Sequence, residues 1–479
     1  MKLLERVAQI SIINRCIILI CTYHIFILGM ICIGRAIYPF HLDWIEGAHV
    51  DVVARILDGQ AIYTPPTLDY IPFIYTPFFF WVSALVSKIM GLGFLPLRLV
   101  SILSSFLSLY LIHRIIRRQS GSLLAALLGA GLMAATYKIS GSSMDMGRID
   151  ALAMLLLLGG INALHAQKNA AVVFGAGILF GLAYMTKQLA ALPILGLTAH
   201  LILTRSKHFI FWALGGLITV GGLSLFLQWQ TDGWYGYYTF ELPRMVTKYF
   251  VTEWVVRFWT NDLWKFLAIP TLASFFYIAF GKRRLFFFLT FTSMLIGSFL
   301  VRSNDGGSPN ALLPIYSIIA ILFGLSFAKL QTTRLKPIVS ILAITALFMP
   351  IFSPLKQIPN TSDRIMGQKI LSVMRATPGS LYAPRYGYLP RMANKTPNAH
   401  RSVLADLIRT DKTKSKIIRA EIKHVFKNQE YAAILCQSDL FPEVIQKYYI
   451  DVENIPLVKS RFWWPNAEPI TYYLPRQQD

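Results

Sequence analysis

The feature that most constrains this chain is a series of long apolar segments joined by short connections that carry basic residues. An α-helix needs about 20 mostly apolar residues to cross the hydrocarbon core of a bilayer. Segments near this length recur between residues 12 and 353. Hydrophobic residues make up 55% of the 479 residues, which is more than an average soluble domain contains. The sequence therefore predicts a polytopic α-helical membrane protein.

With this length requirement, the apolar segments predict about eleven transmembrane helices. They lie near residues 12–38, 97–116, 121–139, 150–165, 170–186, 189–204, 209–228, 263–281, 285–301, 310–328 and 337–353. The first segment follows basic residues, as in a signal peptide, but it is long and no small-residue cleavage site comes after it. We expect it to be a retained membrane anchor.

The basic residues predict which side of the membrane each connection occupies. They cluster at Lys2 and Arg6, Arg114 to Arg118, Lys168, Arg205 and Lys207, Lys282 to Arg284, and Lys329 to Lys336. Cytoplasmic loops carry an excess of Lys and Arg, and all these clusters share one side only if segment 73–90 does not cross the membrane. The N-terminus is then cytoplasmic. A nucleic-acid partner is not expected, because no basic stripe or nucleic-acid-binding fold accompanies the net charge of +22.

An acidic pair, Asp43 and Glu46, follows the first apolar segment on the external side of this topology. Apolar residues recur at helical spacing from residue 46 to residue 58 and predict a short amphipathic helix in the membrane interface. The apolar segment 78–90 is too short to cross the bilayer and is expected to lie at its surface. The first external loop, residues 39–96, is therefore predicted to contain interfacial helices.

The composition changes near residue 353 to a charged and mixed sequence. Helical stretches are expected at 363–375, 400–409 and 414–427, and strands at 379–383, 431–435 and 470–474. We expect two domains, a transmembrane catalytic domain at 1–355 and an extracytoplasmic α/β domain at 356–479. The absence of a terminal retention signal favours a bacterial inner membrane over an endoplasmic reticulum.

Several short motifs make the chain resemble the GT-C class of integral-membrane glycosyltransferases, which includes protein O-mannosyltransferases and lipid A aminoarabinose transferases. The resemblance covers most of residues 12–330. The motifs are Asp43 and Glu46, residues 70–77, residues 96–101, Arg148-Ile149-Asp150, and Lys187-Gln188. Two departures are present: the acidic pair is split by two residues, and a Lys-Pro-Pro run before the segment at 78–90 is absent.

The resemblance implies transfer of a sugar, a hexose or a pentose, from a polyprenyl-phosphate donor to a glycolipid, polysaccharide or protein acceptor outside the cytoplasm. Such a transfer needs a carboxylate to deprotonate the acceptor hydroxyl and cations to hold the departing phosphate. Asp43 is the expected base, with Glu46 and Asp150 as further catalytic candidates. Each has a structural alternative: orienting the interfacial helix for Asp43, capping it for Glu46, and anchoring a span for Asp150.

Donor binding is expected at outward-facing polar residues. Lys187 with Gln188, and Arg302 with Asn310 beyond a Gly-Gly turn, are candidate phosphate or substrate ligands, and Arg148 and Tyr75 complete the set. Snorkelling of Lys187 to the interface and a simple tight turn after Arg302 are the structural alternatives. The aromatic loop at 228–262 fits an interfacial belt or a groove for sugar or prenyl groups.

The motif pattern predicts no cofactor with certainty. No His or Cys spacing suggests a metal site, although carboxylates can recruit a divalent cation, and no nucleotide-binding loop is found. A secondary transporter or a lipid-linked glycan flippase with an outward-facing charged cavity is the rival class. Transporters tend to place charges at the midplane of the bilayer and to contain repeats, whereas these charges lie at helix ends.

Overall fold

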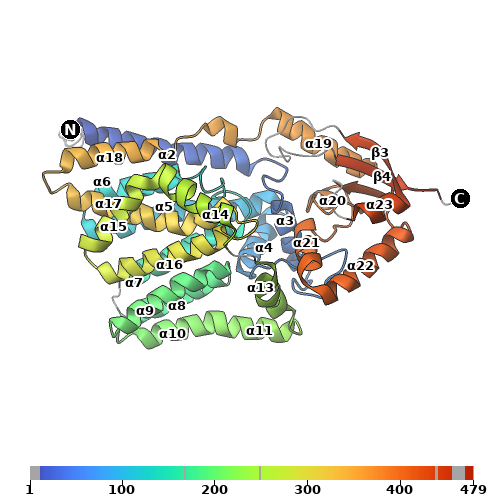
Figure 1. Ribbon diagram of the computed structural model, residues 1–479, viewed down its shortest axis with the longest axis horizontal. Helices are drawn as coiled ribbons and strands as arrows, with labels where there is room; N and C mark the ends of the chain where they lie inside the picture. The colour runs from blue at the N-terminus through green and yellow to red at the C-terminus, as the bar shows by residue number, and fades with distance from the viewer. Residues whose placement is uncertain (1–10, 167–168, 248–249, 437–440, 456–469, 478–479) are drawn as a thin grey trace.

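The computed structural model describes residues 11–166, 169–247, 250–436, 441–455 and 470–477, and it divides into a long helical bundle and a smaller part that contains a sheet (Figure 1). The N-terminal helix α2 (Ile12–Ala36) runs along the bundle towards the C-terminal part. Helices α3 (Glu46–Leu57) and α4 (Phe78–Met90) lie between the bundle and the C-terminal part.

Seven helices in the described residues are long and apolar enough to cross a membrane. They are Ile12–Ala36, Phe94–Ser120, Ile149–Ala166, Phe209–Gln230, Thr252–Phe280, Arg284–Arg302 and Pro309–Leu330. The other predicted spans are also helical but shorter, at Leu123–Ala135, Ala170–Tyr184, Gln188–Leu203 and Lys336–Phe348. The helical membrane fold is therefore confirmed, whereas the count of about eleven crossings rests on these shorter helices.

The elements of the bundle follow the predicted segments closely. They are α5 (Phe94–Ser120), α6 (Leu123–Ala135), α7 (Ile149–Ala166), α8 (Ala170–Tyr184), η1 (Gln188–Ala190), α9 (Ala191–Leu203), α10 (Phe209–Gly216), η2 (Leu217–Gly222), α11 (Leu223–Gln230), α12 (Trp234–Gly236), η3 (Tyr237–Glu241), α13 (Leu242–Val246), α14 (Thr252–Arg257), η4 (Phe258–Lys265), α15 (Phe266–Phe280), α16 (Arg284–Arg302), η5 (Pro309–Leu312), α17 (Leu313–Leu330) and α18 (Lys336–Phe348).

The centre of the bundle is α17, which is apolar on every side and packs against α5, α6, α15 and α16. A helix that is apolar all round has to be buried in protein or lipid. In this span, 94% of the most apolar stretch is buried inside the protein. Helices α6 and α17 approach closely, because a Cβ atom at Gly324 would lie 2.8 Å from the carbonyl oxygen of Ala125. Glycine at this position lets the two backbones pack against each other.

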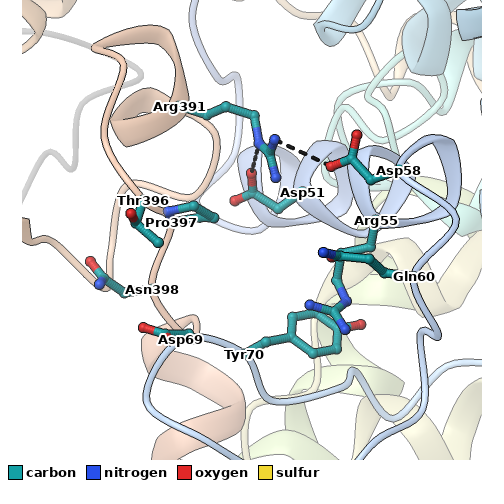
Figure 2. Close-up of a pocket in the computed structure, with 10 residues that line it drawn as sticks. All are labelled: Asp51, Arg55, Asp58, Gln60, Asp69, Tyr70, Arg391, Thr396, Pro397 and Asn398. Atoms are coloured by element: carbon teal, nitrogen blue, oxygen red, sulfur yellow. Dashed lines mark hydrogen bonds and ion pairs between the residues drawn. The ribbon is translucent and has the colours of Figure 1, made fainter.

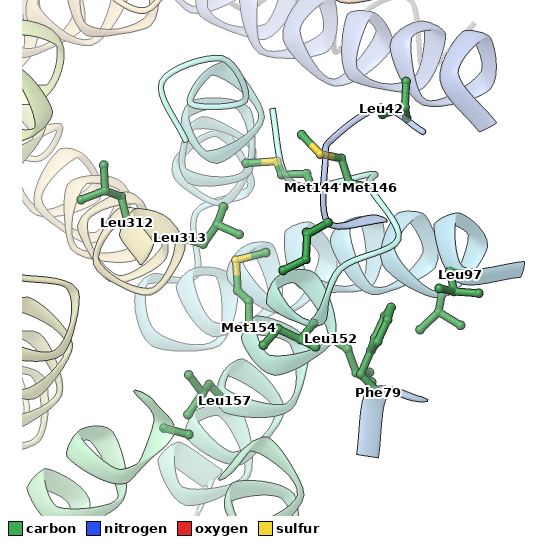
Figure 3. Close-up of a cluster of buried hydrophobic side chains, with 14 of the residues drawn as sticks. Leu42, Phe79, Leu97, Met144, Met146, Leu152, Met154, Leu157, Leu312 and Leu313 are labelled. Atoms are coloured by element: carbon green, nitrogen blue, oxygen red, sulfur yellow. The ribbon is translucent and has the colours of Figure 1, made fainter. Parts of the chain in front are cut away.

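A cluster of buried apolar side chains surrounds the first turns of α7 (Figure 3). Leu152, Met154 and Leu157 project from α7, and side chains from α4, α5 and the α17 end of the bundle lie around them. The labelled neighbours are Phe79 of α4, Leu97 of α5, Met144 and Met146 of the connection between α6 and α7, Leu312 of η5 and Leu313 of α17. The cluster fixes the start of α7, which is where the predicted Asp150 lies.

One end of the bundle collects basic side chains from several connections. Arg283 donates to the carbonyl of His165 at 2.6 Å, and Arg118 donates to the carbonyl of Asn162 at 3.5 Å. Lys329 donates to the carbonyl of Phe280. The connections that carry these clusters therefore share an end, as the charge pattern requires; Lys2, Arg6 and Lys168 fall outside the described residues.

The helix expected at residues 46–58 forms as α3, and protein covers most of it. Its first nine residues, from Glu46 to Ala54, are all buried, including the polar side chains of His49 and Asp51. Protein covers the helix because α3 packs against α4 and α5, and a Cβ atom at Gly47 would lie 3.0 Å from the backbone nitrogen of Tyr388. The polar side chains of α3 thus face other protein groups rather than lipid headgroups.

The C-terminal part combines helices with a four-stranded sheet. Its helices are η6 (Pro354–Gln357), α19 (Thr361–Ala376), α20 (Leu389–Met392), α21 (Arg401–Thr410), α22 (Lys412–Lys427) and α23 (Pro442–Tyr448). The strands β1 (Leu381–Tyr382), β2 (Ala433–Cys436), β3 (Tyr449–Ile455) and β4 (Ile470–Pro475) have the order β1-β2-β4-β3. Strands β1 and β2 are parallel, and the other pairs are antiparallel. The sequence did not predict β3, which pairs at the edge of the sheet with an irregularity between Asp451 and Glu453.

Candidate functional site

The two predicted acidic loops meet at Arg148. Its Nη1 atom contacts Oδ2 of Asp43, and its Nε atom lies 3.2 Å from Oδ2 of Asp150. All three side chains are largely buried, and Asp43 is the most accessible, with 14% of its side chain exposed. Burial lowers the pKa of Arg148, but the carboxylates of Asp43 and Asp150 outweigh this effect and raise the pKa above its ordinary value. The guanidinium therefore stays charged and holds the two loops together.

Asp150 is the most heavily bonded carboxylate of this group. Besides Arg148, Lys187 Nζ lies 2.5 Å from its Oδ1 atom, and Asn310 Nδ2 donates to the same oxygen at 2.8 Å. Asp150 occupies the first turn of α7, where the unpaired backbone N–H groups favour a negative charge. The site thus assembles from the start of α7, the segment between α8 and η1, and the turn before α17.

Glu46 lies close by but is enclosed by hydrogen-bond donors. Arg98 on α5 donates to it through Nε at 2.9 Å and Nη2 at 2.8 Å, and the backbone nitrogens of Leu42 and Gly147 donate at 2.8 and 2.7 Å. Burial alone would raise the pKa of Glu46. Arg98 and the two backbone donors lower this pKa by more than burial raises it, so it lies below its ordinary value. A fully buried carboxylate with both oxygens occupied suits the structural alternative better than a catalytic role.

The segment at 70–77 is fastened to the C-terminal end of α8 and to the residues that follow it. Gln188 Nε2 donates to the carbonyl of Ile74 at 2.7 Å, and Thr76 Oγ1 donates to the carbonyl of Tyr184 at 2.9 Å. Tyr75 stacks beside Phe73, and burial raises the pKa of its phenol to about 12. The predicted residue Gln188 therefore positions this segment, and Tyr75 remains a neutral neighbour of the charged group.

Arg302 makes a separate set of contacts. Its Nε atom lies 2.7 Å from Oδ2 of Asp262, its Nη1 atom donates to the carbonyl of Gly307 at 2.7 Å, and its guanidinium lies 4.7 Å from the ring centroid of Trp254. Among the contacts of the described residues, none joins Arg302 to Asp150 or Lys187. Of the two residues predicted around this turn, the structure brings only Asn310 to the charged group.

The C-terminal part also contributes to the site, which the sequence did not reveal. His400, the residue before α21, stacks on Trp44 with 5.6 Å between ring centroids, and its Nε2 atom lies 3.1 Å from the Trp44 carbonyl. Burial lowers the pKa of His400 to about 3, so the ring is neutral. Trp44 directly follows Asp43 and remains 41% exposed. A partly exposed aromatic side chain therefore lies next in the sequence to the more accessible carboxylate.

The aromatic loop is partly buried and partly exposed. Tyr235, Tyr237, Tyr238 and Phe258 are buried, whereas Trp229, Phe240, Phe250 and Trp259 are exposed. Tyr237 donates to Oδ2 of Asp411 at 2.8 Å, so part of this loop holds the C-terminal part in place. Tyr249 falls outside the described residues.

Metal binding finds no support in the described ranges. They contain no group of three or more His, Cys, Asp or Glu side chains placed to hold an ion. The carboxylates of the site are bound instead to Arg98, Arg148 and Lys187.

The helical bundle is similar in fold to solved membrane proteins of the GT-C class. A family model described as Dolichyl-phosphate-mannose-protein mannosyltransferase matches residues 74–229. The resemblance expected from the short motifs is therefore confirmed. No curated protein matches the sequence.

Solved structures share this fold over nearly the whole chain. ArnT from Cupriavidus metallidurans in the apo state superposes with a TM-score of 0.66 at 13% identity, over 95% of this chain and 97% of that one. The same protein bound to undecaprenyl phosphate gives 0.65 at 12% identity, with the same coverage. The oligosaccharyltransferase AglB from Archaeoglobus fulgidus, in complex with an inhibitory peptide and a dolichol-phosphate, gives 0.54 at 12% identity over 89% of this chain and 73% of AglB. At these identities the comparison establishes the fold alone.

Proposed function

We propose that this protein is a glycosyltransferase that moves a sugar from a polyprenyl-phosphate carrier to an acceptor hydroxyl on the extracytoplasmic face of the membrane. The observation that carries the proposal is the group formed by Asp43, Arg148, Asp150 and Lys187 at one end of a membrane-spanning bundle. It combines a partly accessible carboxylate with two cations. The transfer needs these chemical groups, and relatives in fold were solved with undecaprenyl phosphate or a dolichol-phosphate.

Asp43 is the general base in this proposal. It accepts the proton of the acceptor hydroxyl as the oxygen attacks the anomeric carbon, while the bond from that carbon to the phosphate oxygen breaks. The polyprenyl phosphate leaves with the bonding electron pair. Asp43 is more accessible than Asp150, whose side chain is 1% exposed and is held by Arg148, Lys187 and Asn310. Asp150 therefore positions the cations, and an acceptor reaches Asp43 first.

Lys187 and Arg148 bind the departing phosphate in this proposal. Without substrate their charges are balanced by Asp150 and Asp43. The cavity next to Asp150, Lys187 and Asn310 has a volume of only about 10 Å³, enough for a single water molecule. The donor therefore enters by displacing side chains, and its phosphate exchanges with a carboxylate as the partner of each cation.

The isoprenoid chain occupies an apolar pocket of about 560 Å³ between α8, α9 and α10. Tyr184 and Ala191, which flank Lys187 in the sequence, line one end of this pocket, and Phe209 and Trp212 line it further along α10. A chain bound there runs down from the phosphate into the membrane. Such a pocket buries apolar surface that water would otherwise contact.

The finer topology belongs to the same proposal. With the basic end of the bundle in the cytoplasm, the N-terminus is cytoplasmic, and the site and C-terminal part are extracytoplasmic. The short helices complete about eleven crossings. A bacterial inner membrane suits this arrangement, and a glycolipid, a polysaccharide or a protein hydroxyl serves as the acceptor.

The experiment that tests the function is transfer from a polyprenyl-phosphate sugar by Asp43→Asn in proteoliposomes. General acid–base catalysis contributes about 10²–10⁴-fold, so turnover falls by this factor while donor binding persists. Asp305→Asn, at an exposed carboxylate near the turn before η5, is the matched control and retains turnover. Movement of intact donor across the bilayer without transfer would instead support the transporter or flippase class.

A further inference from the structure

A pocket lined mainly by polar and charged residues, separate from the charged group, lies between the first external loop and the C-terminal part (Figure 2). Its volume is about 360 Å³. The lining comes from α3 and the following loop on one side and from α20 and residues 396–398 on the other. The side chains drawn around it are Asp51, Arg55, Asp58, Gln60, Asp69, Tyr70, Arg391, Thr396, Pro397 and Asn398. Elements far apart in the sequence thus build one cavity.

Asp51 and Arg391 form an ion pair on the wall of this pocket. Oδ1 of Asp51 and Nε of Arg391 both lack a hydrogen-bond partner among the described residues, and Asp51 is only 9% exposed. They lie 3.8 Å apart, which is too far for a hydrogen bond between them. Both atoms are shielded from solvent, so a ligand in the pocket reaches the other polar atoms of these two side chains, which are 12% exposed for Asp51 and 32% exposed for Arg391. A hydroxyl can accept from Arg391 and donate to Asp51 at the same time.

The charges around the pocket restrict the ligand further. Arg391 contacts both Asp51 and Asp58, and its distance to Asp58 is 3.5 Å. Its positive guanidinium therefore repels a cation placed between these two carboxylates. A phosphate or another anion meets three carboxylates, Asp51, Asp58 and Asp69. Positive and negative side chains alternate around the pocket. They therefore favour an uncharged ligand with many hydrogen-bond donors and acceptors.

The remaining lining groups suit such a ligand. The Arg55 guanidinium lies 3.9 Å from the ring centroid of Tyr70 and donates to the carbonyl of Ala61, so this pair forms a fixed wall. Asn398 Oδ1 already accepts from the backbone nitrogen of Ala383, which orients its amide. Gln60 and Thr396 are exposed at the opening. Fixed planar polar groups around a cavity of this size match the hydroxyl-rich surface of a sugar.

We propose that the pocket lined by Asp51, Tyr70, Arg391 and Asn398 binds a neutral, hydroxyl-rich saccharide portion of the acceptor. The assignment rests on the proposed function, since it makes the pocket the place where the acceptor is held. Helix α3 connects the pocket to the site, because Asp43 and Trp44 precede this helix and Asp51 lies within it. An acceptor held by the C-terminal part is thereby linked to the loop that carries the base.

Binding is tested on the full-length protein in nanodiscs by saturation-transfer NMR, with methyl α-mannoside, methyl β-glucoside and methyl N-acetyl-β-glucosaminide as probes. At least one glycoside is expected to receive saturation from the wild type. Asp51→Ala and Arg391→Met are expected to reduce its binding at least fivefold. Arg409→Met, at an exposed arginine of α21, is the matched control and leaves binding unchanged. Absence of saturation for every glycoside, or equal binding by all variants, would overturn the proposal.

Two further measurements separate this proposal from the proposed function. Calcium chloride and inorganic phosphate are added in competition, and displacement of the glycoside by either ion would show a charged-ligand site and overturn the assignment. Transfer assays with a glycan acceptor should show a raised acceptor KM for Arg391→Met and an unchanged donor KM. If the wild type binds no polyprenyl phosphate but still binds glycosides through Asp51, the pocket stands as a saccharide site and the transferase function fails.

Discussion

Lys187 Nζ lies 2.5 Å from Oδ1 of Asp150, although these residues are 37 positions apart in the sequence. Asp150 begins α7, and Lys187 lies between α8 and η1. The lysine side chain is 13% exposed, so this ion pair is largely withdrawn from water. A lysine that only snorkelled to the interface would not need a carboxylate partner, so the pair argues against snorkelling as the whole reason for this residue.

Replacing Lys187 with Met should weaken binding of the donor. The substitution keeps the apolar stem and removes the charge, and a hydrogen bond to a charged group contributes about 1.5–3 kcal/mol. We expect the Kd for polyprenyl phosphate to rise about tenfold or more, measured by microscale thermophoresis in detergent. Lys88→Met, at an exposed lysine in the last turn of α4, should bind like the wild type. Equal loss in both variants would contradict a specific role for Lys187.

Glu46→Gln should act on stability more than on chemistry. The substitution removes the charged partner of Arg98, which is itself fully buried. Breaking one side of a buried ion pair costs about 3–5 kcal/mol. A lower melting temperature in differential scanning fluorimetry is expected, and Asp43→Asn should lower it less, because Arg148 keeps Asp150 as an ion partner. A Glu46→Gln protein with wild-type stability and no transfer would place Glu46 among the catalytic groups.

The contact between the first external loop and the C-terminal part depends on Gly387. This residue has φ +46°, and a Cβ atom there would lie 2.4 Å from the backbone nitrogen of Ala48. Gly387→Ala should therefore loosen the contact, with a cost of about 1–3 kcal/mol and faster proteolysis of the C-terminal part. Gly59→Ala is the control, since Gly59 has φ +70° but nothing within 4 Å of the added atom. Equal proteolysis of the two variants would show that backbone strain, and not the contact, is responsible.

The stability of the protein should depend on pH through Asp51. Burial raises the pKa of this carboxyl to about 7 from 3.8, although Arg391 opposes the shift. Between pH 3.8 and pH 7 the folded protein keeps the proton on Asp51, whereas the unfolded chain loses it. The free energy of unfolding therefore falls as the pH rises from 3.8 to 7. The charged or titratable groups near Asp51 are Arg55, Asp58, Tyr70, Tyr388 and Arg391.

Asp51→Asn should remove this dependence, because the amide carries no proton that folding can retain. At pH 8 the variant is expected to be more stable than the wild type by on the order of 1 kcal/mol, and at pH 4 the two should be similar. Thermal melting across this pH range checks the prediction. A wild-type curve that rises between pH 4 and pH 7, with Asp51→Asn following it, would contradict the raised pKa.

The sequence predicted the membrane fold and the meeting of Asp43 with Asp150 because both depend on local rules. Apolar length indicated the helices, and the basic clusters placed both carboxylates on one side. The buried state of α3 was not predictable in this way. Its polar residues at helical spacing suit a membrane surface as well as an interface with protein, and the covering residues Gly387 and Tyr388 lie far along the chain.

The partners of individual charges were also beyond the sequence. Arg98 was recognised within a motif at the start of a span, but its bond to Glu46 depends on how α5 packs against the entry to α3. Arg302 and Lys187 both follow apolar helices at the outer end, yet only Lys187 contacts Asp150. The contribution of His400 required the position of the C-terminal part, which no local pattern specifies.

The central claim is that the phosphate of a lipid-linked donor binds at the group formed by Asp43, Arg148, Asp150 and Lys187. A cryo-electron microscopy structure of the full-length protein with polyprenyl phosphate tests it directly. The claim predicts phosphate density within hydrogen-bonding distance of Lys187 and Arg148, with isoprenoid density between α8 and α10. Phosphate density beside Arg302, or at the basic end of the bundle near Arg283, would contradict it.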